Sequence, residues 1–539
     1  MNSIRVNWVA LSIAGLVALP ILTVVSQSLF AGSEVFSHLL DTVLADYVLN
    51  SLILMAGVGI GTVFMGVPAA WLAAMCDFPG RRWLDWGMLL PLAMPAYVIA
   101  YTYTGMLDFA GPVQTLLREL TGWSYGDYWF WDIRTHSGAI AMLVLVLYPY
   151  VYLMARATFL EQSSVSFEAS RNLGYSPFRA FLKVAIPMAR PAIIAGVSLA
   201  LMETLADYGT VQYFGIPTFS TGIFRTFYGF GDANGAAQLA SLLLLFVATL
   251  IFVERYSRRK LSYNIRAGSR AMASRIQLKG GRAWLAALAC FIPFFFGFLL
   301  PAGQLLSWSV FDAQMPWSDF ITLSWNSFYL AGLAALIAIV LATLLAYTQR
   351  FNTGSLVKQA TQFAALGYAL PGTIIAIGVL SPLVFVDQSL LALSERFGLG
   401  MSGLIFSGTL FALLIAYTVR FLAVALGSVQ SGLGQISPSL DEAAKGMGRS
   451  PFQVLRQIHA PLMKSSLLTA LLVVFVDVLK ELPATLMLRP FDFNTLAVRA
   501  FELASDERLI EAAPPSLMIV AVGLVPVLLL NRAISRHKH

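Results

Sequence analysis

Long apolar stretches recur along the whole chain, separated by short polar loops. A helix needs about 20 apolar residues to cross the hydrocarbon core of a bilayer, and twelve stretches reach that length. A transmembrane β-barrel is disfavoured, because its strands would be about 10 residues long with alternating polarity. We therefore predict an all-α integral membrane protein with about twelve transmembrane helices. The predicted spans are residues 8–30, 48–75, 87–107, 138–157, 188–211, 237–254, 283–310, 327–348, 361–386, 403–426, 466–488 and 513–531.

The order of features in the first half of the chain is repeated in the second half. Pro95 and Pro371 are 276 residues apart, and segments 168–187 and 442–461 match at an offset of 274. Each half has an even number of spans, so both halves enter the membrane from the same side. This predicts two parallel repeats related by an axis along the membrane normal, with a site at their interface. The predicted units are a first six-helix repeat at 1–255, a basic cytoplasmic linker at 256–282 and a second six-helix repeat at 283–539.

Charged residues make up only 12% of the chain, whereas hydrophobic residues make up 58%. A soluble domain carries roughly 25% charged residues, and a disordered chain needs low hydrophobicity, so both classes are excluded. The net charge of +7 would suit nucleic acid, but its distribution indicates membrane topology instead. With the N-terminus in the cytoplasm, the cytoplasmic segments hold 27 of the 35 Lys and Arg residues, and this count includes Arg420. The positive-inside rule then predicts that both termini are cytoplasmic.

Two predicted cytoplasmic loops, one in each half, share a helix–turn–helix pattern. Glu- and Ala-rich residues favour the first helix, and Gly174 or Gly448 suits its left-handed end. A Ser-Pro pair then suits the cap and first turn of a second short helix, which we expect to end before Pro187 or Pro461. One copy alone would be interpreted as an ordinary capped loop. Two copies favour a stiff elbow that another protein can move.

This paired pattern resembles the Glu-Ala-Ala loop of permease subunits in binding-protein-dependent ABC importers. Relative to the family pattern, Ser170 replaces the third Ala, and Val184, Ile186 and Ala460 replace the usual residues. These departures leave open whether the two halves couple equally. The resemblance covers nearly the whole chain and implies a fused two-repeat permease whose elbows dock on an ATPase. The coupling residues that it implies are Glu168, Ala169, Gly174, Pro187, Glu442, Ala443, Gly448 and Pro461.

The resemblance also implies partners and a location. No Walker A pattern, Gly-x-x-x-x-Gly-Lys-Ser/Thr, occurs in the chain. We therefore expect that the chain is not an enzyme and binds no cofactor, and that two copies of a separate ATPase use the ATP. A periplasmic or membrane-tethered binding protein is expected to deliver the substrate. The implied location is the bacterial inner membrane, with lipid around the spans and no nucleic-acid partner.

Four acidic residues lie inside predicted spans, where ionisable side chains are costly and often functional. Glu203 and Asp207 are spaced i, i+4 on one helix face, and Asp477 and Glu481 repeat this spacing 274 residues later. The repeat axis would bring the two faces together, so we predict a ring of carboxylates that binds a metal cation transiently. The alternative is internal pairing, since Lys480 can reach Asp477 along the same helix.

The segments around these acids include Tyr208-Gly209-Thr210 and Pro483-Ala484-Thr485. They resemble ferric-iron importer permeases most. This resemblance implies that the chain forms the translocation path for ferric iron handed over by a binding protein. Fused permeases for thiamine have a similar layout, so thiamine or another small cation is an alternative substrate. A twelve-helix secondary transporter is the alternative of another class, and it would need neither elbows nor an ATPase. The aromatic loop 108–137 either docks the binding protein or lies at the membrane interface.

Overall fold

The computed structural model of the chain is almost entirely helical, as predicted. It describes residues 3–124, 126–161, 174–259, 275–351, 354–398, 400 and 403–536, with side chains except at 3–7, 161, 177, 258–259, 445 and 529–536. Glu168 and Ala169 therefore lie outside the described residues, as does most of the linker predicted at 256–282.

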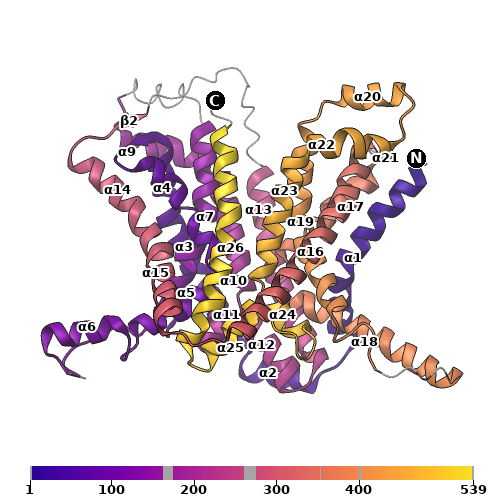
Figure 1. The fold of residues 1–539 in the computed structure, drawn as a ribbon, viewed down its shortest axis with the longest axis horizontal. Coiled ribbons are helices and arrows are strands. Elements are labelled where there is room, and N and C mark those ends of the chain that lie inside the picture. The colour runs from indigo at the N-terminus through magenta and orange to yellow at the C-terminus, as the bar shows by residue number, and fades with distance from the viewer. Residues whose placement is uncertain are drawn as a thin grey trace.

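Long apolar helices form the body of the molecule (Figure 1). Within the described ranges, ten helices are long and apolar enough to cross a membrane, or up to twelve when two bent helix pairs each count as one span. The prediction of an all-α membrane protein with about twelve spans is confirmed. The long helices are α1 (Ser3–Phe30), α3 (Leu44–Met75), α7 (His136–Glu161), α10 (Ile186–Ala206), α13 (Ala233–Arg259), α14 (Gly281–Phe294) continued by α15 (Leu300–Ser307), α16 (Trp317–Phe351), α18 (Gly372–Phe397), α19 (Leu410–Gly434) and α26 (Leu509–Arg536).

Shorter helices connect and interrupt these spans. In the first half they are α2 (Glu34–Thr42), α4 (Arg81–Gly87), η1 (Leu90–Ala93), α5 (Ala96–Leu107), α6 (Pro112–Thr121), α9 (Pro177–Ala180), η2 (Phe181–Ala185), α11 (Gly209–Tyr213), α12 (Phe219–Phe224) and η3 (Arg225–Gly229). In the second half they are η4 (Phe295–Leu299), η5 (Trp308–Asp312), α17 (Ser355–Ala364), η6 (Gly367–Ala369), α20 (Pro438–Gly446), α21 (Pro451–Val454), η7 (Leu455–His459), α22 (Ala460–Leu462), α23 (Lys464–Leu479), α24 (Pro483–Leu488) and α25 (Leu496–Ser505).

Two of the predicted spans are not continuous helices, because each is interrupted at a proline that has an equivalent in the other repeat. The span predicted at 87–107 is broken at Pro95, with a 95° bend between residues 81–93 and 96–121. The span predicted at 361–386 begins only at Gly372, after the corresponding Pro371. Proline lacks an N–H group and pushes the preceding residue out of the helical region. Met94 and Leu370 accordingly have extended backbone, with ψ of 116° and 125°.

A short parallel β-pair anchors the C-terminal end of the linker. Strand β1 (Cys76–Asp77) pairs with β2 (Ile276–Gln277), and Gln277 Nε2 donates to Asp77 Oδ2 at 3.0 Å. The chain that enters the second half is thereby fixed to the end of α3, which belongs to the first half.

The helices pack into two lobes that are not the two sequence repeats (Figure 1). The core of lobe one joins α3, α5 and α7 with α14, α15, α25 and α26 from the second half. The core of lobe two joins α16, α18, α19 and α23 with α1 and α13 from the first half. Each repeat therefore contributes its first and last long helix to the lobe that contains the middle of the other repeat.

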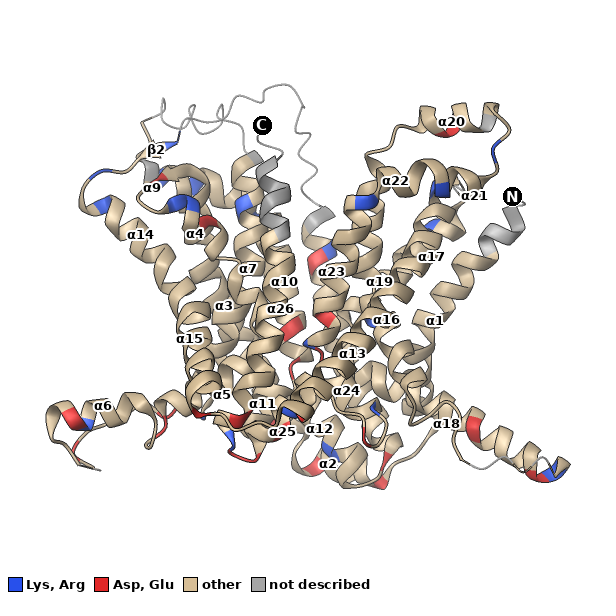
Figure 2. Cartoon of the chain, viewed as in Figure 1, with Lys and Arg blue, Asp and Glu red and all other residues tan. Residues whose placement is uncertain are grey.

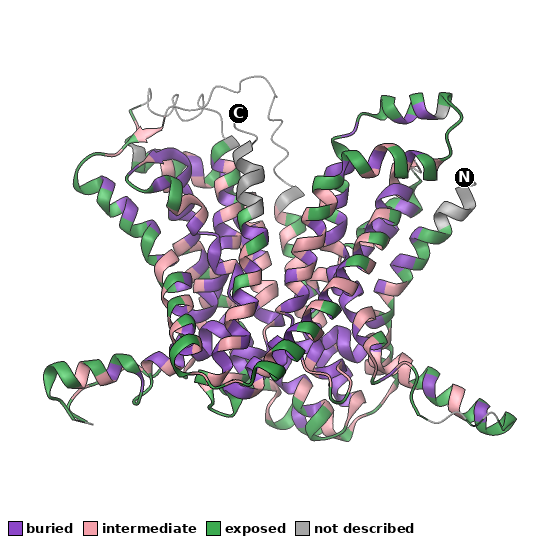
Figure 3. Ribbon diagram, viewed as in Figure 1, coloured by how far each residue is buried: buried purple, intermediate pink, exposed green. Residues whose placement is uncertain are grey.

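Small residues allow the helices of each lobe to approach closely. On α3, a Cβ added at Gly57 or Gly61 would lie 2.5 Å from a side-chain atom of Ile140 or Val144 on α7. Close approach at small residues is the usual basis of helix association in lipid. Exposed residues lie on the outer faces of the helices (Figure 3). On α3 they include the apolar residues Ile60 and Phe64, as expected for contact with lipid chains.

The two lobes meet at one end of the molecule and diverge toward the other (Figure 1). Helices α9, α20, α21 and α22 and both ends of the chain lie at the diverging end, which we call the elbow end. Lys and Arg residues gather there around α4, α9, α14, α21 and α22 (Figure 2). Helices α6, α11, α12, α24 and α25 lie toward the opposite end, where the lobes are in contact.

Candidate functional site

The second predicted elbow is a helix–turn–helix, as expected. Helix α20 ends near Gly448, which has a φ of +73°. Ser450 caps α21 through a reciprocal capping box with Gln453, and Pro451 occupies the first turn. In the first half Gly174 also has a positive φ, +82°, and the Ser176 side chain accepts from Arg179 N at 3.3 Å. The local prediction for the turns is confirmed in both halves.

The prediction that the second helix of each elbow ends before a proline is wrong. The helix continues through Pro187 into α10 and through Pro461 in α22. In both halves a π-helical turn, η2 or η7, directly precedes the proline segment. A wider turn changes the hydrogen-bond register, so the missing proline N–H and the ring clash are accommodated. The elbow is therefore mechanically continuous with the long helix that follows it in the first half.

A buried polar network fixes the second elbow to lobe two. Asp441 of α20 accepts from Arg350 Nε at 2.7 Å, and its other oxygen pairs with His459 Nε2 at 2.7 Å. Arg350 also donates to the carbonyl oxygens of Leu433 and Ile436 at 2.5 and 2.9 Å. Because Arg350 comes from α16, motion of the elbow is transmitted directly to a long helix.

The second elbow exposes apolar side chains as well as two of the predicted coupling residues. Glu442 and Ala443 are exposed, and Met447 and Phe452 beside them are 70% and 69% exposed. Phe178 is 68% exposed at the equivalent position of the first elbow. Exposed apolar side chains on a projecting segment are typical of a surface that binds another protein.

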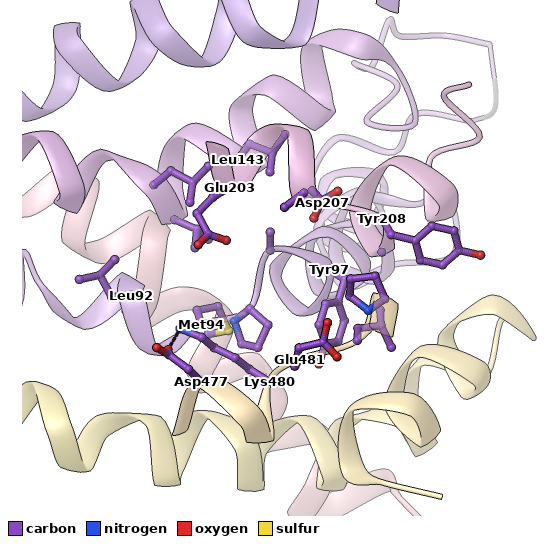
Figure 4. Close-up of a pocket in the computed structure, with 18 of the residues that line it drawn as sticks. Leu92, Met94, Tyr97, Leu143, Glu203, Asp207, Tyr208, Asp477, Lys480 and Glu481 are labelled. Carbon is purple, nitrogen blue, oxygen red and sulfur yellow. Dashed lines mark ion pairs between the residues drawn. The ribbon is translucent and has the colours of Figure 1, made fainter. Parts of the chain in front are cut away.

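All four predicted intramembrane carboxylates line one cavity between the lobes, with a volume of about 120 Å³ (Figure 4). Glu203 and Asp207 lie on one side of the open space, and Asp477, Lys480 and Glu481 lie on the other. The four acids therefore lie around one cavity, as predicted. The prediction that each pair shares one helix face is wrong, because α10 ends at Ala206 and α23 ends at Leu479.

Two of the four carboxylates, Asp207 and Glu481, cap short helices. Asp207 accepts from Thr210 Oγ1 at 2.9 Å and from Val211 N at 3.1 Å, at the start of α11. Glu481 accepts from the backbone N–H groups of Ala484 and Thr485 at 3.0 Å, at the start of α24. A carboxylate at this position satisfies N–H groups that have no partner within the helix. These two equivalent acids thus have the same structural role in both repeats.

The other two acids, Glu203 and Asp477, have different partners. Glu203 Oε1 accepts from Tyr368 Oη at 2.9 Å, a hydrogen bond between the lobes. Asp477 forms an ion pair with Lys480 Nζ at 2.9 Å, so internal pairing is correct for this residue. Across the described ranges, no group of three or more His, Cys, Asp or Glu side chains is arranged to hold a metal ion. Transient metal binding by the four acids stays a prediction.

Arg420 lines the cavity, but the charge count places it among the cytoplasmic Lys and Arg residues, and this placement is wrong. Arg420 lies in the middle of α19, is 9% exposed and donates through Nη1 to Glu481 Oε1 at 3.1 Å. It is not a cytoplasmic loop residue, because α19 extends to Gly434. A single arginine barely lowers the mean hydropathy of an apolar stretch. Its position inside the span predicted at 403–426 could nevertheless have marked Arg420 as a candidate functional residue.

The chain was compared with known protein families. The family model for the binding-protein-dependent transport system inner membrane component matches residues 66–262 and again residues 338–537. The chain belongs to this family. It is therefore a membrane-embedded transport subunit and not itself an enzyme, and the secondary-transporter alternative is overturned. The double match also agrees with the internal repeat that the sequence predicted.

Similar curated proteins cover most of the chain. The Fe(3+)-transport system permease protein FbpB 2 of Haemophilus influenzae is 26% identical over 494 residues, 91% of this chain and 90% of that protein. The ferric transport system permease protein FbpB of Actinobacillus pleuropneumoniae is 24% identical over 526 residues, 92% of this chain and 72% of that protein. The molybdenum transport system permease protein ModB of Escherichia coli is 29% identical over 208 residues, 36% of this chain and 86% of that protein.

Proposed function

We propose that this chain forms the translocation path of an ATP-driven importer for ferric iron handed over by a binding protein. The observation that carries the proposal is similarity along 91% of the chain to a ferric permease. The acidic cavity between the lobes supports it, because hard carboxylate oxygens suit a hard cation. A path must also release its cargo, so incomplete coordination is compatible with transport.

Two copies of a separate ATPase are proposed to drive transport, one on each elbow. The support is that the chain has two equivalent left-handed turns, at Gly174 and Gly448, each followed by an exposed phenylalanine, and no Walker A pattern of its own. Glu168 and Glu442, with Gly174 and Gly448, are the proposed coupling residues. The chain itself is proposed to bind no cofactor. A periplasmic or tethered binding protein would dock at the end opposite the elbows.

The proposed topology places both termini in the cytoplasm of a bacterium, with the spans in the inner membrane. The elbows must face the compartment that contains ATP, and both termini lie at the elbow end (Figure 1). The gathering of Lys and Arg at that end supports the same orientation (Figure 2). The proposed repeat bounds remain 1–255 and 283–539, joined by the linker at 256–282.

The proposed transport cycle uses relative motion of the lobes. The lobes are in contact at the outer end and diverge at the elbow end (Figure 1), an arrangement that would release cargo to the cytoplasm. Closure of the ATPases would bring the elbows together, and the α16 and α10 helices attached to them would follow. The hydrogen bond from Tyr368 to Glu203 joins the lobes at the cavity, so it must break or shift in each cycle.

Uptake by the complete complex in proteoliposomes tests the proposed function. Radiolabelled iron and radiolabelled thiamine are supplied separately through candidate binding proteins, with ATP inside the vesicles. The expected result is ATP-dependent uptake of iron and none of thiamine. Uptake of thiamine without iron would overturn the proposed substrate while leaving the importer class intact.

A further inference from the structure

The central cavity contains hydrogen-bond donors without an acceptor. Tyr97 Oη and Arg420 Nε have no hydrogen-bond partner among the described residues. Tyr97 is 4% exposed and Arg420 is 9% exposed, and both line the cavity. Buried polar groups are normally satisfied, so each exception points to a missing partner.

A helix N-terminus at the same cavity adds further donors. Helix α5 begins at Ala96, and Pro95, Ala96 and Tyr97 all line the cavity. The first helical bond is donated by Val98 to Pro95 O at 3.0 Å, so the N–H groups of Ala96 and Tyr97 precede it. Such N–H groups, together with the positive end of the helix dipole, favour an anion.

The Arg420 guanidinium lies close to the backbone at Gly372. A Cβ added at Gly372, the first residue of α18, would lie 2.5 Å from Arg420 Nη1 and 2.7 Å from Glu481 Oε1. A side chain at position 372 would therefore displace this ion pair from its present place. One Nη1 donor is used by Glu481, and the buried Nε–H group is a donor left without an acceptor.

On the opposite side of the cavity, two acidic side chains lack a cationic partner. Glu203 and Asp207 form no ion pair among the residues that the structure describes. Figure 4 shows these two acids across the open space from Tyr97 and Glu481. A bare cation would satisfy the acids and leave the donors unpaired. A free anion would satisfy the donors but would be repelled by the acids.

We propose that the path carries ferric iron together with an oxyanion that stays bound to the metal. The oxyanion contacts Tyr97 Oη, Arg420 Nε and the N-terminus of α5, and the metal faces Glu203 and Asp207. This inference rests on the proposed iron function and adds the chemical form of the cargo. The complex passes intact, without a redox step. Inorganic phosphate, carbonate and the carboxylate of an organic chelator share the required chemistry.

Double labelling of the cargo tests the inference in proteoliposomes of the complete complex. Radiolabelled iron is supplied with labelled phosphate, bicarbonate or citrate in three separate arms. We expect one oxyanion to enter with iron at a fixed ratio. Entry of iron with no oxyanion in any arm would overturn the inference and retain the iron function. Entry of an oxyanion alone would overturn the iron function and retain the anion subsite. Entry of neither would overturn both.

Tyr97→Phe separates ligand binding from folding. The hydroxyl has no partner within the described chain, so its removal should leave assembly and thermal stability unchanged. We expect the apparent affinity for iron carried with the oxyanion to fall roughly tenfold, because a hydrogen bond to a charged ligand is lost. Arg420→Lys, which keeps the charge beside Glu481 but lacks the Nε donor, should show the same loss.

Tyr148→Phe is the matched control. Tyr148 is also fully buried but does not line the cavity, so this variant should transport like the wild type. Unchanged affinity in both Tyr97→Phe and Arg420→Lys would overturn the anion subsite.

Discussion

Glu203 and Asp477 occupy equivalent positions in the two repeats, but their surroundings differ. Glu203 accepts a hydrogen bond from the neutral hydroxyl of Tyr368, whereas Asp477 is paired with Lys480. The equivalent cap residues differ in the same way, since Glu481 is paired with Arg420 and Asp207 has only neutral partners. The cations of the cavity thus come from the second repeat alone, which makes the path electrically asymmetric.

Neutralising the two acids that do not cap helices should strongly reduce transport. We expect iron uptake by the double variant Glu203→Gln, Asp477→Asn to fall roughly tenfold or more, because two negative charges that line the cavity are removed. The variant should still copurify with the ATPase. Glu119→Gln, an exposed acid on α6, is the control. Normal uptake by the double variant would contradict a role of these acids in the path.

The two cap residues should differ in their effect on stability. Asp207→Ala removes a helix cap, which costs about 1 kcal/mol. Glu481→Ala removes a cap and also leaves Arg420 buried without its partner, and breaking a buried ion pair costs about 3–5 kcal/mol. Thermal unfolding of the purified protein should therefore show a larger loss for Glu481→Ala. Equal losses would mean that the Arg420 pair contributes little.

At the scale of elements, prolines and glycines give the helices their breaks and turns. Pro95 and Pro371 each end one helical segment and precede the next. The start of α5 lines the central cavity, and the start of α18 at Gly372 lies against Arg420 and Glu481, which line it. At Pro187 and Pro461 the helix instead continues, because a π-helical turn precedes each proline. The same residue type thus interrupts a span at one place and lets the elbow continue at another.

The left-handed turn of the second elbow should be required for coupling. Gly448 has a φ of +73° and open space around its Cα, so Gly448→Val is strained by backbone conformation alone, at about 1–2 kcal/mol. We expect binding-protein-stimulated ATP hydrolysis to continue while iron uptake falls. Gly446→Val is the matched control, because Gly446 is equally open but has no positive φ. Equal behaviour of the two variants would argue against the turn.

The α6 arm is expected to lie in the membrane interface and not on the binding protein. Gln114 and Arg118 on one side bond to the adjoining loop, while Val113, Leu116 and Leu120 are exposed on the other. The arm projects sideways from the bundle, as does the end of α18 in the second half (Figure 1). A spin label at Leu120 should be accessible to oxygen dissolved in lipid, and one at Glu119 to a water-soluble reagent. The reverse pattern would favour docking of a protein.

At the scale of the molecule, the exchange of first and last helices ties the repeats together. Neither repeat can complete a lobe alone, since lobe one needs α14 and α26 and lobe two needs α1 and α13. The linker joins α13 of lobe two to α14 of lobe one in sequence, and its C-terminal end pairs with β1 through β2. Fusion of the two repeats therefore guarantees that both lobes are made together.

A chain divided between Arg259 and Arg275 should reassemble. We expect the two fragments to be degraded when expressed singly, because each exposes the surfaces meant for the swapped helices. Coexpression should restore copurification and iron uptake. Stable accumulation of either fragment alone would contradict the exchanged packing.

The sequence by itself determined the features that depend on neighbouring residues. Span length, the repeat, the turns at Gly174 and Gly448 and the i, i+4 acids all follow from local chemistry or from bilayer thickness. The predictions of span length, repeat and turns survive, apart from the shape of the helices around four prolines, where the competition between a break and a π-helical turn depends on packing. The prediction that each pair of acids shares one helix face is wrong, because α10 ends at Ala206 and α23 ends at Leu479, inside the spans predicted at 188–211 and 466–488.

Only the tertiary structure decided how the spans pair and what each acid contacts. The bonds of Glu203 to Tyr368 and of Glu481 to Arg420 join residues 165 and 61 positions apart, and no local pattern specifies them. The exchange of helices between the lobes also cannot be predicted from the sequence. All the spans are apolar, and which of them pack together in lipid depends on the fit of their surfaces. Which surfaces fit together, and hence which charges meet at the cavity, is a property of the assembled molecule.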